Sequence, residues 1–125
     1  MISASFIFNK GEFDDEYYRL DEQIAQAAKA TSGYIGEESW ENPQSGKVCT
    51  VYYWEGREGL RELMANADHL KAKSASSRWL AGYQVVVSEV LATYGTKGYE
   101  HILNGRGFDN SGLRSPPGPH APAST

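Results

Sequence analysis

The sequence predicts an α+β fold with a four-stranded antiparallel sheet and two main helices. Four short segments are rich in β-branched and aromatic residues, as strands are. Between them, apolar residues recur at three- and four-residue spacing, which is typical of a helix with one buried face. The order of elements is therefore β-α-β-β-α-β, with the two middle strands joined as a hairpin. This is the order of the ferredoxin-like fold.

The first strand and helix are expected near the N-terminus. Residues 2–8 are predicted to form a strand rather than a signal peptide, because no basic stretch precedes them and no small-residue cleavage site follows. The carboxylates of residues 14–16 suit the first turn of a helix, where the dipole is positive. Gly33 is a suitable stop after that helix. Its apolar face is formed by Phe13, Tyr17, Leu20, Ile24 and Ala27 or Ala28.

The middle of the chain predicts the hairpin. Residues 34–41 and 48–54 have strand composition, and the turn-forming residues 42–46 connect them. Regular alternation would place Tyr34 and Trp40 on one strand face, with room beside them at the intervening glycine.

The remaining elements complete the predicted sheet. The second helix is expected around residues 60–67, with Leu60, Leu63, Met64 and Ala67 on its buried face. Asp68 is placed to cap a further short helix over residues 69–76. Residues 83–91 return to strand composition and are predicted to be the fourth strand.

Composition limits the class of protein. The 125 residues carry a net charge of −4, which argues against a nucleic-acid partner because such proteins usually present a basic face. No apolar run is long enough to span a membrane, and the single cysteine excludes an internal disulfide. We therefore expect a cytoplasmic protein. One histidine, one cysteine and scattered carboxylates in residues 1–95 predict no metal site.

The last part of the chain differs in composition. Residues 1–95 are predicted to form the folded domain, whereas residues 96–125 hold most of the prolines and show no strong periodicity. Residues 99–103 could form a turn of helix. From Gly105 onward we expect a disordered tail, or an arm that lies on a partner.

The sheet face away from the helices predicts a partner. On the third strand this face would carry Cys49, Val51 and Tyr53. An apolar face of that size is not expected to stay bare in so small a chain. The natural cover is the same face of a second copy, so the sequence predicts a homodimer that packs sheet against sheet.

Four stretches of the chain resemble the antibiotic biosynthesis monooxygenase family. They are Gly33 to Trp40, Tyr53-Trp54-Glu55, Asn66-Ala67-Asp68-His69 and Trp79-Leu80-Ala81-Gly82-Tyr83. The resemblance covers roughly residues 3–95 and implies a dimeric α/β barrel with a ligand pocket between helices and sheet. Three functions stay open under it. They are a cofactor-independent monooxygenase that oxidises a small aromatic or quinol-type compound with O2, a haem-binding or haem-degrading protein, and a non-catalytic small-molecule-binding dimer.

Two departures from the family pattern bear on these alternatives. Haem-degrading relatives have a histidine one helical turn after His69, where this chain has Lys71 to Ser74. Quinol-oxidising members tend to have an asparagine four residues before the Trp-Glu pair, and Thr50 stands there. The first departure weakens the haem alternative, and the second means that the quinol-oxidising site is not fully reproduced either. The monooxygenase leads on the weight of the family resemblance alone, with no cofactor expected and haem as the alternative.

The resemblance also suggests which side chains would form the site. Trp54 would stack on a planar substrate or be simply core, and His69 would hold a proton or brace the start of its helix. The side chains expected to shape the pocket or bind the aromatic ligand are Tyr34, Trp40, Thr50, Tyr52, Trp79 and Tyr83. Most of the tryptophans and tyrosines among them could equally be packing.

Overall fold

The structure is a computed structural model that describes residues 1–66, 69–70, 73, 79–104, 106 and 108–109. The chain divides into two compact units, Met1–Glu89 and Val90–Thr125, and each is described by itself. The division falls a few residues before the one expected from composition.

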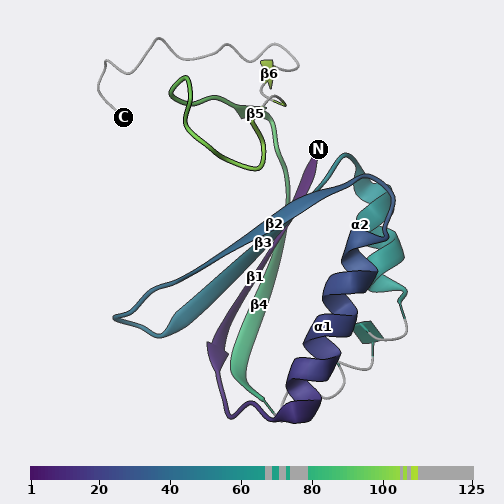
Figure 1. The fold of residues 1–125 in the computed structure, drawn as a ribbon, viewed down its shortest axis with the longest axis vertical. Coiled ribbons are helices and arrows are strands. Elements are labelled where there is room, and N and C mark those ends of the chain that lie inside the picture. Colours follow the sequence, from purple (N-terminus) through teal and green to yellow (C-terminus); the bar gives the residue numbers. More distant parts are fainter. Residues whose placement is uncertain (67–68, 71–72, 74–78, 105, 107, 110–125) are drawn as a thin grey trace. The chain divides into compact units, whose positions relative to one another are not determined.

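The first unit confirms the predicted α+β order. Its sheet contains β1 (Ile2–Lys10), β2 (Tyr34–Glu41), β3 (Lys47–Trp54) and β4 (Leu80–Glu89), in the spatial order β2-β3-β1-β4. All three strand pairs are antiparallel. Helices α1 (Asp15–Lys29) and α2 (Arg57–Met64) lie side by side on one face of the sheet (Figure 1). We call this the helix-side face and the opposite one the helix-free face.

Local sequence signals explain the ends of α1. The Asp14 carboxylate accepts a hydrogen bond from the backbone N–H of Tyr17 at 2.9 Å, which satisfies one donor of the first turn. At the other end the chain turns at Gly33, whose φ of +72° is one that side chains rarely adopt. Gly33 also lies against the side chain of Glu55. A larger residue at this position would therefore be disfavoured both by its φ and by lack of space.

The core lies between the two helices and the sheet. Ala4, Ala28, Trp54 and Leu63 form its buried cluster. α2 crosses closely over Trp54, because a Cβ added at Gly59 would lie 2.2 Å from Cδ1 of that ring. The predicted buried face of the second helix is partly wrong: Met64 is 43% exposed, since α2 ends there. Ala67 lies outside the described residues.

A shift in strand register changes the predicted faces of β2. Tyr34 lies opposite Trp54, but Gly36, two residues on, already lies opposite Tyr53. This extra residue on β2 turns the strand over, as a β-bulge does. Tyr34 therefore faces the helices, whereas Trp40 lies opposite Cys49 on the helix-free face. The expectation that Tyr34 and Trp40 share a face was wrong because it assumed unbroken alternation.

The segment after α2 has a different cap from the predicted one. Asn66 accepts a hydrogen bond from the backbone N–H of His69 at 3.1 Å through its side-chain oxygen. His69, Leu70 and Lys73 are helical, in keeping with a short helix there. The predicted cap, Asp68, lies outside the described residues.

The second unit contains more regular structure than predicted. Strands β5 (Ala92–Thr93) and β6 (Phe108–Asp109) pair antiparallel, so part of the expected tail after Gly105 belongs to a small ladder. Leu103 is buried within a turn between them. No described helix, in either unit, has the length and apolar character needed to cross a membrane.

Candidate functional site

Three tyrosines and two carboxylates gather on the helix-side face over β2 and β3. Tyr34 and Glu37 come from β2, Tyr52 from β3, and Tyr17 and Asp21 from α1. The bulge brings the first two together, and the Tyr34 hydroxyl donates a hydrogen bond to Glu37 Oε1 at 2.8 Å. We call these five residues the tyrosine–carboxylate cluster.

Burial keeps the phenols of the cluster protonated. It is the largest cause that raises the pKa of Tyr52, and the charges of Glu37 and Asp21 add to it. The pKa of Tyr34 is raised by burial and then by its hydrogen bond to Glu37. Burial and the charge of Asp21 raise the pKa of Tyr17 to about 12. All three hydroxyls are therefore hydrogen-bond donors at neutral pH.

The same surroundings affect the acid on α1. Partial burial raises the pKa of Asp21 above its ordinary value, and the neighbouring carboxylates of Glu37 and Glu22 raise it further. A carboxylate with a raised pKa accepts a proton more readily than an ordinary surface aspartate. The cluster thus combines proton acceptors with phenolic donors in one place.

Trp54 packs against two tyrosines of the cluster. Its ring stacks on Tyr52 with centroids 6.0 Å apart and meets Tyr34 edge-on at 6.3 Å. The side chain is fully buried, and its indole N–H donates to the Thr31 hydroxyl at 2.8 Å. These contacts favour the interpretation of Trp54 as core, because its ring has no exposed surface and its only donor is used internally.

Thr50 on β3 and Tyr83 on β4 lie on the same face of the sheet. The hydroxyl oxygens of Thr50 and Ser39 are 2.6 Å apart and share a hydrogen bond. Across β1, Thr50 lies opposite Phe6, whose ring contacts Tyr83 edge-on at 5.6 Å. The helix-side face therefore collects four of the predicted residues, namely Tyr34, Thr50, Tyr52 and Tyr83, above Trp54.

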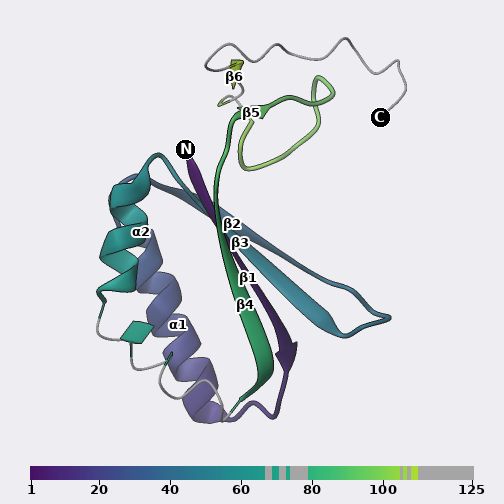
Figure 2. The same cartoon turned by 180° about the vertical axis from the view of Figure 1, so that it is seen from behind.

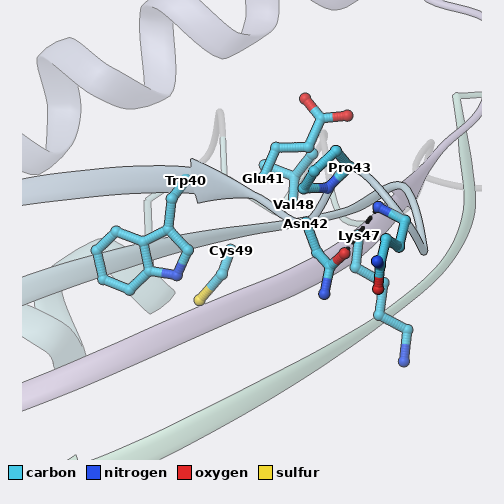
Figure 3. Close-up of a pocket in the computed structure, with 8 residues that line it drawn as sticks. Trp40, Glu41, Asn42, Pro43, Lys47, Val48 and Cys49 are labelled. Atoms are coloured by element: carbon cyan, nitrogen blue, oxygen red, sulfur yellow. Dashed lines mark hydrogen bonds between the residues drawn. The ribbon is translucent and has the colours of Figure 1, made fainter.

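Trp40 is separated from this group by the sheet. It lies on the helix-free face beside Cys49 and is 54% exposed, at the rim of a surface cavity of about 560 Å³ (Figure 3). The cavity surrounds the end of the β2–β3 hairpin, where Asn42 and Lys47 meet. Trp40 therefore cannot line a pocket together with Tyr34 and Tyr52.

Trp79 has a packing role at the start of α1. It is buried, and its indole N–H donates to the Asp14 carboxylate at 2.8 Å. Its backbone oxygen accepts a hydrogen bond from Gly11, and its ring meets Tyr17 edge-on. Trp79 thus fixes the N-terminus of α1, and through Tyr17 it contacts the edge of the cluster.

His69 has an unusual environment for a helix start. Its side chain is half-buried, and Nδ1 is inaccessible to solvent with no hydrogen-bond partner among the described residues. Burial lowers the pKa of His69, and the charge of Lys73 lowers it further. The imidazole is therefore mainly neutral near pH 7 and able to accept a proton.

Sequence reasoning missed three members of the cluster. Tyr17 and Asp21 are four residues apart and so share a helix face, which was a readable signal. Glu37 gave no such signal, because only the bulge brings it to the side of Tyr34. Within the described part of the chain, no group of three or more histidine, cysteine or acidic side chains could hold a metal ion.

Comparisons with known proteins give matches only to solved structures. No protein-family model matches the sequence, and no curated protein does. A putative antibiotic biosynthesis monooxygenase from Deinococcus radiodurans superposes with a TM-score of 0.63 at 15% identity, covering 78% of this chain and 100% of its own. This chain has the antibiotic biosynthesis monooxygenase fold.

Two further structures support the same assignment of fold. Rv0793 from Mycobacterium tuberculosis gives a TM-score of 0.61 at 16% identity, covering 75% of this chain and 98% of that one. SnoaB, described as a cofactor-independent oxygenase from Streptomyces nogalater, gives 0.61 at 12% identity, covering 74% and 94%. At such identities the likeness extends to the fold and not to the chemistry of particular side chains.

Proposed function

We propose that this protein is a cofactor-independent monooxygenase that oxidises a small electron-rich phenol or quinol-type compound with O2. The observation that carries the proposal is the tyrosine–carboxylate cluster, which offers proton acceptors and phenolic donors on the helix-side face. Its position on a fold shared with a cofactor-independent oxygenase supports the same reaction class. We further propose that it works as a cytoplasmic homodimer with no cofactor.

The reaction needs only proton handling and charge stabilisation from the protein. Removal of the phenolic proton raises the electron density of the ring, and the anion passes one electron to O2. The resulting superoxide and phenoxyl radical combine at a ring carbon that carries a hydrogen, and the proton taken from the phenol returns to the peroxide anion to give a hydroperoxide. Loss of water then leaves a quinone, so one oxygen atom enters the substrate and the other leaves in water. Substrate and O2 supply all atoms and electrons.

Each member of the cluster has a role in this scheme. Asp21, assisted by Glu37, accepts the phenolic proton, because its raised pKa makes it the better base. Tyr52 donates a hydrogen bond to the phenolate oxygen; no described group accepts its hydroxyl hydrogen. Thr50 on β3 and Tyr83 on β4 border the ring of the substrate, and Trp54 holds Tyr34 and Tyr52 in position.

His69 is a second proton acceptor in the proposal. Its imidazole is neutral and can accept a proton for a short time, because burial and the charge of Lys73 favour the release of that proton. In the alternative function, a haem protein, the same histidine would be the haem ligand. Trp40 and Trp79 are left out of the site, because one lies on the opposite face and the other is engaged with Asp14.

Oxygen uptake tests the proposal directly. The metal-free protein is mixed with a reduced hydroxynaphthalene or anthrone-type phenol, and O2 consumption and quinone absorbance are followed together. We expect equal amounts of O2 consumed and quinone formed, with a rate that falls in Tyr52→Phe. Absence of uptake with such phenols would contradict the enzymatic function.

A haemin titration distinguishes the haem-binding alternative from the monooxygenase. We expect no saturable Soret band at one haem per chain. A one-to-one titration that is lost in His69→Ala would replace the monooxygenase by a haem protein, with His69 as the axial ligand.

A further inference from the structure

Trp54 lies between two tyrosines on the helix-side face. Its ring centroid is 6.0 Å from that of Tyr52 and 6.3 Å from that of Tyr34. Indole and phenol rings are the most easily oxidised aromatic groups of a protein, and electrons pass quickly between rings that are this close. An electron removed from Trp54 can therefore be replaced from a neighbouring tyrosine.

The surroundings of the rings decide where the missing electron comes to rest. Oxidation of Trp54 leaves a positive charge in a fully buried side chain, whose indole N–H is bonded only to the neutral hydroxyl of Thr31. An unpaired charge in such a place is costly. Oxidation of Tyr52 meets the same difficulty, because no described group accepts its hydroxyl hydrogen. Neither ring can pass its proton to a described base.

Tyr34 differs because a carboxylate accepts its hydrogen. Glu37 Oε1 lies 2.8 Å from the Tyr34 hydroxyl, within reach for a proton transfer. A phenol that loses an electron becomes a strong acid, so its proton moves to Glu37. The products are a neutral tyrosyl radical and a neutral carboxylic acid, with no buried charge left behind. Tyr34 is also only partly buried, so a reductant in solution can reach it.

We propose that Trp54 and Tyr34 form a one-electron relay that moves oxidising equivalents out of the core. The oxidant is an oxygen-centred radical of the alkoxyl or hydroxyl class, such as homolysis of an organic hydroperoxide produces. It takes one electron from Trp54 and becomes the alkoxide or hydroxide. Trp54 regains an electron from Tyr34, whose proton passes to Glu37. A reductant then returns one electron to Tyr34, and Glu37 returns the proton. The relay goes beyond the proposed oxidation, because it uses only residues of this chain.

A second tyrosine–glutamate bond provides a matched control. Tyr53 donates to Glu38 at 2.8 Å. It is the neighbour of Trp54 in the sequence, but alternation along β3 places its side chain on the helix-free face. Figure 2 shows α1 and α2 together on the other side of the sheet, which is the side of the Trp54 ring. Contact with that ring is what should select Tyr34 over Tyr53.

Pulsed photo-oxidation of tryptophan in the full chain tests the relay. All proteins carry Trp40→Phe, which removes the exposed tryptophan. Trp79, which contacts Tyr17, is kept in all of them, so its contribution is the same throughout. A light pulse at the long-wavelength edge of the indole band ejects an electron from tryptophan, and transient absorption follows the tryptophan and tyrosyl radicals. We expect the tyrosyl signal to rise as the Trp54 radical decays, and to rise more slowly in D2O because a proton moves in the same step.

Variants of the two hydrogen-bonded pairs identify the route. Tyr34→Phe should lose the tyrosyl signal that forms from the Trp54 radical, and that radical should live longer. Glu37→Gln should lose the D2O effect on the same step, which a change in packing alone would not cause. Tyr53→Phe and Glu38→Gln should behave like the Trp40→Phe parent. Circular dichroism checks that each variant keeps the fold.

Two results would overturn the relay. One is a folded Tyr34→Phe variant with the yield and decay of the parent, and the other is loss of the tyrosyl signal in Tyr53→Phe instead. The measurement contains no phenol substrate and follows no oxygen uptake. Failure of the relay and failure of the proposed monooxygenase are therefore distinguishable.

Discussion

Two tyrosine–glutamate hydrogen bonds lie on opposite faces of the same hairpin. Tyr34 donates to Glu37, and Tyr53 donates to Glu38, each at 2.8 Å. The glutamates are neighbours in sequence, and both phenols have raised pKa values. The bonds are nearly identical, but their surroundings are not.

The difference lies in what packs over each pair. On the helix-side face, α1 brings Tyr17 and Asp21 to the pair, and Tyr52 stands beside it on β3. On the helix-free face, burial is the first cause that raises the pKa of Tyr53, and the groups that add to it are Glu38 and Cys49. A partly buried phenol–carboxylate bond is thus not in itself a chemical site. The helix-side pair is a candidate functional site because neighbouring elements add an acid of raised pKa and a further hydrogen-bond donor.

The largest contrast in stability is expected between two tryptophans on the two faces. Trp54→Phe should lower the free energy of unfolding by about 1 to 3 kcal/mol, because it leaves space in a filled core and leaves Thr31 without its indole donor. Trp40→Phe on the exposed side of the hairpin should change it by less than about 0.5 kcal/mol. Denaturant unfolding measures both. Equal losses would show that Trp40 is covered and would break the comparison between the faces.

A smaller effect is expected at alkaline pH. The folded-state pKa of Tyr53 is raised from 10.0 to about 12, chiefly by burial and by the bond to Glu38. The unfolded chain therefore releases this proton first, and stability present below about pH 10 is lost as the pH rises toward about 12. Tyr17 and Tyr52 act in the same direction.

Phenylalanine variants separate these contributions. Tyr52→Phe and Tyr53→Phe should each flatten the alkaline fall of the unfolding midpoint. Tyr18→Phe is the matched control, because its side chain is 59% exposed. If all three variants show the wild-type slope, burial of the two phenols does not govern the alkaline behaviour.

The fold could be predicted from the sequence because it depends on periodicity. The alternation of strand residues and the apolar stripe of α1 are local patterns that packing enforces, so order and topology were right. The faces of β2 could not be predicted in the same way. One residue of register shift between Tyr34 and Gly36 placed Trp40 on the helix-free face and brought Glu37 to the side of Tyr34.

The membership of the site was predictable only in part for the same reason. The sequence named Tyr34, Tyr52 and Trp54 as candidates through the family resemblance, and the structure brings the three rings into contact. Asp21 was overlooked because an acidic residue on a helix surface is ordinary until the element beneath it is known. Its pKa is raised first by loss of solvation and then by the charge of Glu37, a residue 16 positions away on another element.

The central claim is that an O2-reactive phenol loses its proton to a carboxylate on the helix-side face, and a pair of neighbouring variants tests it most directly. Oxygen uptake with a quinol-type phenol is measured across pH for Glu37→Gln and Glu38→Gln. We expect Glu37→Gln to lower the rate by about 10²-fold. Its remaining acid limb should move to lower pH, because loss of the neighbouring charge lowers the pKa of Asp21. Glu38→Gln should keep the wild-type rate and profile. Equal rates in the two variants, or a loss confined to Glu38→Gln, would contradict the account.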